Sequence, residues 1–97
     1  MEIDCELLIE KNTIYRFNKG YVDYWQGVGS FYSALVKGGN VVNTFWKPIC
    51  FCLNSLRIKT TKICGYRKCL CEFYDANGQR GFVVLHLEFI FRHLEEA

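Results

Sequence analysis

The side chains of this chain that are best suited to chemistry belong to its six cysteines. They occur singly, as Cys5 and Cys64, and as two C-x-C pairs, Cys50/Cys52 and Cys69/Cys71. Residues i and i+2 of a strand point to the same side, so two such pairs on neighbouring strands in register would bring four thiols together. Four convergent thiolates are a zinc-binding arrangement. One interpretation is therefore a zinc site formed by Cys50, Cys52, Cys69 and Cys71.

The surroundings of the two pairs favour a plainer interpretation, in which the thiols are buried and reduced. Cys50 and Cys52 lie in the wholly apolar run ICFCL, and Cys69 and Cys71 share their predicted strand face with Phe73. Free cysteine is among the most often buried residue types, and zinc-binding pairs usually have two to four residues between the cysteines. We expect no cofactor, with zinc as the alternative and a disulfide as the least favoured case.

A second group with chemical potential is the basic block between residues 57 and 68, which contains no acidic side chain. With Tyr66 or Tyr74 it could bind single-stranded RNA, with cations on phosphates and rings under bases. The net charge of +2 is small for a nucleic-acid-binding domain, and a solvated strand face or pairing with the acidic first ten residues explains the block more simply. RNA binding is therefore the alternative function, carried by Arg57, Lys59, Lys62, Arg67 and Lys68.

Aromatic residues make up 16% of the chain and supply the candidate contacts with a protein partner. Tyrosine and tryptophan often anchor interfaces, and the segment YVDYWQ contains three such rings, although we expect Trp25 itself in the core. Trp46, next to the Lys47-Pro48 pair, is expected to be partly exposed. A predicted C-terminal strand, residues 83–91, is the second candidate contact. The candidate interface residues are Tyr21, Tyr24, Trp25, Val83, Leu85, Leu87, Phe89 and Phe91.

Nothing in the sequence predicts catalysis. The two histidines, His86 and His93, have no neighbour that forms a known nucleophile–base signature. The sequence has no glycine-rich phosphate loop, paired-acid motif or dinucleotide fingerprint. We expect a protein that is not an enzyme.

The elements that must position these residues are short strands. Turn signals recur along the chain, and the short runs between them are rich in Val, Ile, Thr, Tyr and Phe, which predicts an all-β sandwich or barrel. Gly38-Gly39 and Asn77-Gly78 predict two tight hairpins, because both pairs can supply the positive φ angles of such turns. After the second turn, apolar and polar residues mostly alternate from residue 83 to 91, which predicts a strand.

Residues 22–37 allow two interpretations. Trp25, Val28 and Leu35 fall on one helical stripe, but Gly27 and Gly29 inside it each cost about 1 kcal/mol relative to alanine, so we favour strands. The whole chain, residues 1–97, is predicted to be one all-β domain, a sandwich or partly open barrel built from antiparallel hairpins, with room for one short helix. The tail RHLEEA is expected to fray or to form one helical turn.

The composition indicates how such a domain works. Hydrophobic residues make up 51% of the chain, more than a small core hides, so we expect exposed apolar patches and a homodimer, formed most simply by pairing of strand edges. No run is long enough to span a membrane, and the acidic N-terminus does not resemble a secretory signal. We therefore expect an intracellular protein. Its residue usage is that of a U-rich coding sequence, as found in some RNA viruses.

The main prediction is a small non-enzymatic interaction protein, a virus-encoded accessory protein that binds a host partner and acts as a homodimer. The first alternative is the zinc-containing module that binds RNA. The second alternative is a β protein that binds lipid in a cavity between its sheets.

Overall fold

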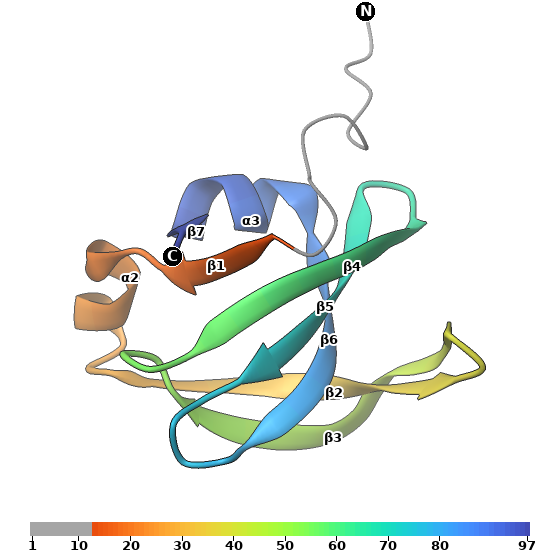
Figure 1. Cartoon of the computed structure of the whole chain (residues 1–97), viewed down its shortest axis with the longest axis horizontal. Coiled ribbons are helices and arrows are strands. Elements are labelled where there is room, and N and C mark those ends of the chain that lie inside the picture. Colours follow the sequence, from red (N-terminus) through yellow and green to blue (C-terminus); the bar gives the residue numbers. More distant parts are fainter. Residues whose placement is uncertain (1–12) are drawn as a thin grey trace, which may run out of the picture.

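Antiparallel hairpins build this protein, as the sequence predicts. The computed structural model describes residues 13–97, which form a mostly β structure with two short helices (Figure 1). In chain order the elements are β1 (Ile14–Phe17), α2 (Lys19–Tyr24), β2 (Val28–Lys37), β3 (Asn40–Cys52), β4 (Arg57–Gly65), β5 (Lys68–Tyr74), β6 (Arg80–His86), α3 (Leu87–His93) and β7 (Leu94–Glu96). The predicted all-β class is confirmed, with two short helices instead of one.

Glycines with positive φ angles lie in the turns of both predicted hairpins, a tight turn between β2 and β3 and a longer one, residues 75–79, between β5 and β6. Gly38 and Gly39, with φ angles of 59° and 78°, connect β2 to β3, and Gly78, with a φ of 81°, lies in the turn between β5 and β6. Residues with a Cβ rarely adopt such angles, so the glycines explain why the chain reverses at these two places. A third hairpin joins β4 to β5, and there Arg67 takes a positive φ of 55°.

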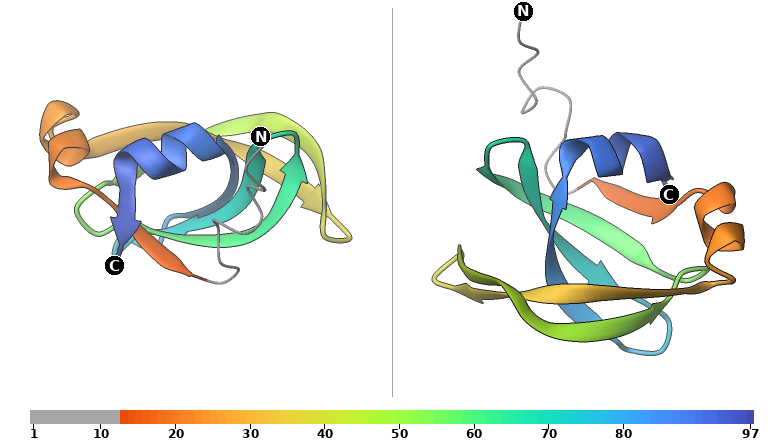
Figure 2. Two further views of the ribbon diagram at one scale, coloured as in Figure 1. Left: turned by 90° about the horizontal axis from the view of Figure 1, so that it is seen from above. Right: turned by 180° about the vertical axis from the view of Figure 1, so that it is seen from behind.

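The seven strands found in residues 13–97 belong to one antiparallel sheet in the order β3-β2-β6-β5-β4-β1-β7. β5 pairs with β6 along its whole length, whereas β2 and β6 share a single pair, Ala34 opposite Phe82. Beyond that pair the two strands diverge, and the β2–β3 hairpin crosses the strands β4, β5 and β6 at a steep angle (Figures 1 and 2). The sheet is therefore open and strongly bent.

Aromatic rings fill the space inside the bent sheet. Phe31 and Phe51, from the β2–β3 hairpin, contact Phe73 of β5 with ring centroids 5.2 and 5.5 Å apart. Phe17 of β1 stacks on Phe31 at 5.8 Å and meets Phe89 of α3 edge-on at 6.0 Å. Ring pairs of this kind contribute about 0.5–1.5 kcal/mol each beyond their buried area. The rings thus join the crossing hairpin to the rest of the sheet.

The predicted C-terminal strand is correct only in its first half. β6 ends at His86, and the chain continues as α3. The partner strand β5 begins at Lys68, which pairs with His86, so the residues after His86 have no strand beside them on that side. Leu87 instead donates its backbone N–H to the carbonyl of Arg67, 2.9 Å away in the β4–β5 turn. The end of β5 therefore ends β6 as well.

The sequence of α3 suits a helix as well as it suits a strand. Leu87, Ile90 and Leu94 are all buried, and their i, i+3, i+7 spacing is that of one helical face. Glu88 lies in the first turn and Arg92 in the last, which complements the helix dipole. The tail after α3 forms β7, which pairs with β1, so it does not fray.

The segment with two interpretations contains a helical turn followed by a strand. α2 begins after Asn18, whose Oδ1 accepts the backbone N–H of Tyr21 at 2.9 Å, a standard N-terminal cap. Gln26 and Gly27, with φ angles of 56° and 79°, end it, and β2 starts at Val28, so the preference for a strand is confirmed from there. No helix in residues 13–97 is long and apolar enough to cross a membrane.

Candidate functional site

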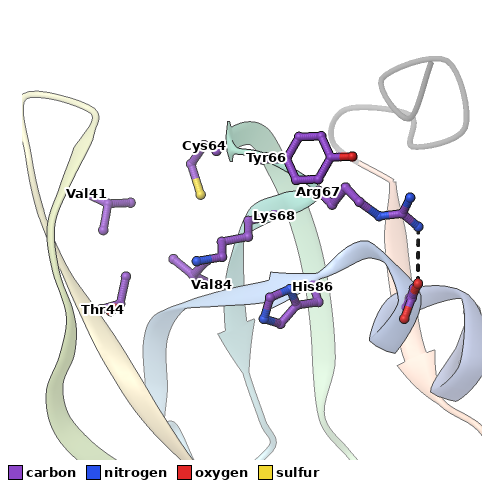
Figure 3. A pocket seen from close by; sticks show the side chains of 10 residues that line it. Val41, Thr44, Cys64, Tyr66, Arg67, Lys68, Val84 and His86 are labelled. Carbon is purple, nitrogen blue, oxygen red and sulfur yellow. Dashed lines mark hydrogen bonds and ion pairs between the residues drawn. The ribbon is translucent and has the colours of Figure 1, made fainter. Parts of the chain in front are cut away.

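A groove opens between the β2–β3 hairpin and the turn that joins β4 to β5 (Figure 3). Its volume of about 700 Å³ lies within the range of about 300–1,000 Å³ that is typical of ligand sites. Val41 and Thr44 line it on the hairpin, Cys64 and Lys68 line it on the opposite wall, and Val84 and His86 of β6 lie between the walls. We call this hollow the basic groove.

A bulge in β4 determines which lysines reach this side of the sheet. Lys59 pairs with Glu72, and Lys62 pairs with Leu70, so both lysines share the face of the sheet that carries Glu72 and Leu70 and points away from the core. We call it the second face. Without an extra residue, positions 59 and 62 would point to opposite faces. Thr61 is that residue, and its hydroxyl donates to the carbonyl of Leu70 at 2.7 Å.

The β2–β3 hairpin is held against the second face by a side-chain contact. Lys62 donates from Nζ to Oδ1 of Asn40, at the tip of the hairpin, across 3.2 Å. Leu70 is only 3% exposed, although it lies on the second face. The contact between Lys62 and Asn40 thus helps to define one end of the basic groove.

The basic groove continues into a smaller hollow of about 340 Å³ at the place where β2 and β6 diverge. This hollow, the side cleft, is lined by residues 30–32 of β2 and residues 83–86 of β6. Thr44, Lys68, Val84 and His86 line both hollows, so the two are continuous. The apolar side chains at positions 31, 83 and 85 belong to the core cluster or pack against it, which makes the bottom of the side cleft apolar.

The basic groove contains a lysine that has no ion-pair partner among residues 13–97. Lys68 and His86 lie opposite each other on β5 and β6, and neither side chain has a hydrogen-bond or ion-pair partner among residues 13–97. Nη2 of Arg67 lies 3.3 Å from Oε1 of Glu88, and both side chains are substantially exposed. An exposed pair of this kind contributes only about 0–1 kcal/mol. The groove is therefore suited to an anionic ligand group.

Cys64 brings a thiol to the wall of the groove (Figure 3). Burial raises the pKa of Cys64, and the neighbouring Cys69 raises it further, while Lys68 and Lys62 lower it by less. A raised pKa keeps the thiol protonated at neutral pH, and the protonated form is a poor nucleophile. Cys64 is thus a lining residue of the groove and not an activated nucleophile.

Exposed apolar side chains gather on the β2–β3 hairpin. Tyr32 is 55% exposed, Val42 59%, Phe45 71% and Trp46 54%, and the rings of Tyr32 and Phe45 meet edge-on at 5.6 Å. We call these four residues the hairpin patch. The exposure of Trp46 agrees with the sequence-based expectation. Large exposed aromatic groups of this kind mark interaction surfaces.

The predicted interface residues divide into three groups in the structure: buried, half-buried and exposed. Val83, Leu85 and Leu87 are buried in the core, so they supply no surface; the alternating pattern that we assigned to an interface strand is the core face of β6. Tyr21 and Phe89 are half-buried and contact each other with ring centroids 5.8 Å apart. The exposed members of the set are Tyr24, Trp25 and Phe91.

The exposure of Trp25 differs from the sequence-based expectation. The sequence favoured the core, but Trp25 is 51% exposed and follows α2 directly. Tyr21 takes the inner position of this segment and stacks on Phe17 at 4.4 Å. Only one side of a single helical turn faces the core, and Val22 and Tyr21 occupy it.

The predicted RNA-binding residues lie close together but do not form one continuous surface of free cations. Arg57, Lys59 and Lys62 are half-buried on β4, and Lys59 faces Glu72 on the next strand. Arg67 is paired with Glu88, and Lys68 lines the basic groove. No observation here tests RNA binding, so it stays a prediction.

The arrangement predicted for zinc is wrong. Cys50 and Cys52 lie on β3, and Cys69 and Cys71 lie on β5, but β2 and β6 separate these strands in the sheet. Cys50 is exposed, whereas Cys69 and Cys71 are buried. Residues 13–97 contain no group of three or more His, Cys, Asp or Glu side chains that could hold a metal ion. The five cysteines in this range are free thiols, and Cys5 lies outside the described residues.

Comparisons with known proteins do not assign a family. No protein-family model, no curated protein and no solved structure matches the chain. The candidate site is therefore defined by the geometry of its residues and not by similarity to a known site. Sequence reasoning missed Thr44, Phe45 and Val84 as neighbours of Lys68, because a residue's strand neighbours follow from strand order, which no local pattern in this chain encodes.

Proposed function

We propose that this protein is a small intracellular interaction protein without enzymatic activity, which docks on a protein partner and associates with a second copy of itself. The observation that carries the proposal is the hairpin patch, four large apolar side chains that are each more than half exposed. Aromatic side chains that are buried on association supply most of the binding energy of typical interfaces. An accessory protein that acts on a host partner fits this description.

The hairpin patch supports a contact between faces better than a contact between strand edges. β3, which carries most of the patch, is one of the two edge strands of the sheet, as edge pairing requires, but Pro48 in its middle has no N–H to donate. Between the pairs Ser33/Lys47 and Leu35/Asn43, three residues of β3 face Ala34 alone. Such a bulge disrupts the ladder and protects an edge from pairing. We therefore assign self-association to the side chains of the patch.

The two alternative functions predicted from the sequence, RNA binding and lipid binding, differ in how well the fold suits them. The bulge at Thr61 aligns Lys62 with Lys59 on the second face, and this alignment favours RNA binding as a second candidate function. The lipid alternative has no such support, because aromatic rings occupy the inside of the bent sheet.

Sedimentation velocity over a range of protein concentrations tests the proposal. We expect a monomer–dimer equilibrium that Val42→Ser combined with Trp46→Ser weakens by at least about tenfold, since interface anchors cost about 2 kcal/mol or more when truncated. A matched control is Tyr24→Ser combined with Phe91→Ser, which removes apolar side chains that are exposed elsewhere. A wild-type protein that stays monomeric at all concentrations, or an equal effect of the control, would contradict the proposal.

A further inference from the structure

We propose that the side cleft and the basic groove together accept an extended segment of a partner protein, in which apolar and acidic side chains alternate and whose backbone pairs with the free edge of β6. This inference rests on the proposed function as an interaction protein and names the chemistry of the partner. The side cleft shares Tyr32 and Phe45 with the hairpin patch, whereas Val42 and Trp46, the two patch residues substituted in the dimer test, line neither hollow.

The first argument is the unpaired edge of β6. Residues 80–86 pair with β5 along one edge, but along the other edge only Phe82 has a partner in β2. Alternate backbone N–H and C=O groups of residues 83–86 therefore point away from β5, and no strand among residues 13–97 pairs with them. These four consecutive residues line the side cleft, so the free groups face a hollow. An added peptide strand satisfies such an edge by main-chain hydrogen bonds.

The second argument concerns the two sides of that edge. Side chains of a strand added beside β6 alternate between the faces of the sheet in the same way as those of β6. On one face they meet Phe31, Val83 and Leu85, which are apolar. On the other face they meet Lys68 and His86, which lie beside Val84 and have no hydrogen-bond or ion-pair partner within residues 13–97. The two faces thus select an apolar residue and an acidic residue at successive positions.

The third argument distinguishes a peptide from a nucleic acid. Glu88 lines the basic groove beside Arg67, and its carboxylate repels a row of closely spaced phosphates more strongly than it repels one carboxylate bound at Lys68. The net charge of +2 is small, whereas binding of nucleic acid depends on many phosphate contacts. A free strand edge offers hydrogen bonds to a peptide main chain, which a nucleic acid does not have.

Fluorescence anisotropy with defined probes tests the inference on the full-length protein. The main probe is a labelled heptapeptide of sequence Ser-Val-Glu-Val-Glu-Val-Ser, and the matched probe replaces both glutamates with lysine. A third probe carries N-methyl groups on alternate residues, which remove main-chain donors, and a fourth is a labelled oligouridylate. We expect the acidic peptide to bind at least about tenfold more tightly than the lysine peptide, as charge complementarity at an interface allows.

The variant Lys68→Glu adds a test that includes its own control for folding. It should reverse the preference, so that the lysine peptide binds more tightly than the acidic one. Lys47→Glu makes the same change of charge at an exposed residue of β3 that lines neither hollow, and it should leave the preference unchanged. Because a reversed preference requires binding, a loss of folding cannot imitate the expected result.

The possible outcomes separate this inference from the proposed function. Equal binding of the acidic and lysine peptides, or full binding of the N-methylated peptide, overturns the strand-addition inference. Tighter binding of oligouridylate than of the acidic peptide overturns it in favour of RNA. In each of these cases the dimerisation measurement on Val42 and Trp46 still decides the proposed function, since neither residue lines the groove or the cleft.

Discussion

At the scale of single residues, cysteine has two different environments in this protein. Cys69 and Cys71 are fully buried on the core face of β5, where they pack as small apolar side chains. The hydrogen bond with Cys69, together with burial, raises the pKa of Cys71. Cys50 is exposed on the edge strand β3. Cysteine is therefore a core residue at positions 69 and 71 and a solvent-exposed residue at position 50.

We expect alkylation to distinguish these environments. In the native protein, iodoacetamide should modify Cys50 first, while Cys69 and Cys71 react only after unfolding, because burial blocks access to both thiols and the pKa of Cys71 is also raised. Cys64 should react slowly at pH 8 and faster at higher pH, since its pKa is raised above the ordinary value of about 8.5. Peptide mass mapping over time measures each site separately.

Denatured protein, in which the thiols should react at similar rates, is the control for this measurement. If Cys71 were modified in the native protein as fast as Cys50, the placement of β5 at the centre of the sheet would be wrong.

At the scale of elements, one carboxylate connects the β5–β6 turn to the end of β3. Oδ1 of Asp75 accepts the backbone N–H groups of Asn77 and Gln79 at 3.0 and 3.1 Å, and Oδ2 accepts that of Cys52 at 3.0 Å. Asp75 is buried, so its charge is stabilised by these three donors and not by water. The turn therefore helps to fix the crossing hairpin on the sheet.

Asp75→Ala should lower the free energy of unfolding by about 2–4 kcal/mol, because three hydrogen bonds to a charged group are lost and their partly buried N–H donors are left without this acceptor. Urea unfolding followed by tryptophan fluorescence measures the change. Asp23→Ala is the matched control; Asp23 forms an exposed ion pair with Lys19 within α2, and its loss should cost less than about 1 kcal/mol. Equal effects of the two substitutions would show that Asp75 does not join β3 to the turn.

At the scale of the whole molecule, the order of the strands decides which surfaces exist. β5 and β6 lie in the interior of the sheet, while β3 and β7 are its edges. The β2–β3 hairpin shares only one backbone pair with β6 and is otherwise joined to the rest of the sheet by side-chain contacts, so it leaves the side cleft beside β6. Both the hairpin patch and the groove follow from this crossing.

The rates of amide hydrogen exchange should follow the order of the strands in the sheet. Amides of β5 should exchange most slowly, because both of its edges are paired, and amides near the bulge and Pro48 of β3 should exchange fastest among the strands. Mass spectrometry of peptic fragments measures the protection. The experiment should be repeated at low and high protein concentration, because self-association through the hairpin patch adds protection to β3 only in the concentrated sample. Equal protection of β3 and β5 in the dilute sample would contradict the sheet order.

Sequence alone determined the local features of this protein. Gly38-Gly39 and Asn77-Gly78 predicted their hairpins because positive φ angles exclude most other residues, and the apolar runs between turns predicted the strands. The same reasoning found Trp46 exposed and found the basic residues that contribute Lys68 to the groove. Each of these properties depends on a few adjacent residues.

The tertiary structure alone decided which residues meet. The segment after β6 has both strand and helix periodicity, and the end of β5 at Lys68 selected the helix. The two cysteine pairs are identical in spacing, but two strands lie between them, so no four-thiol site forms. Lys68, His86 and Phe45 come together only because β2 leaves β6 after a single pair. Contacts between distant segments arise from the packing of the whole sheet, and a local pattern carries no information about them.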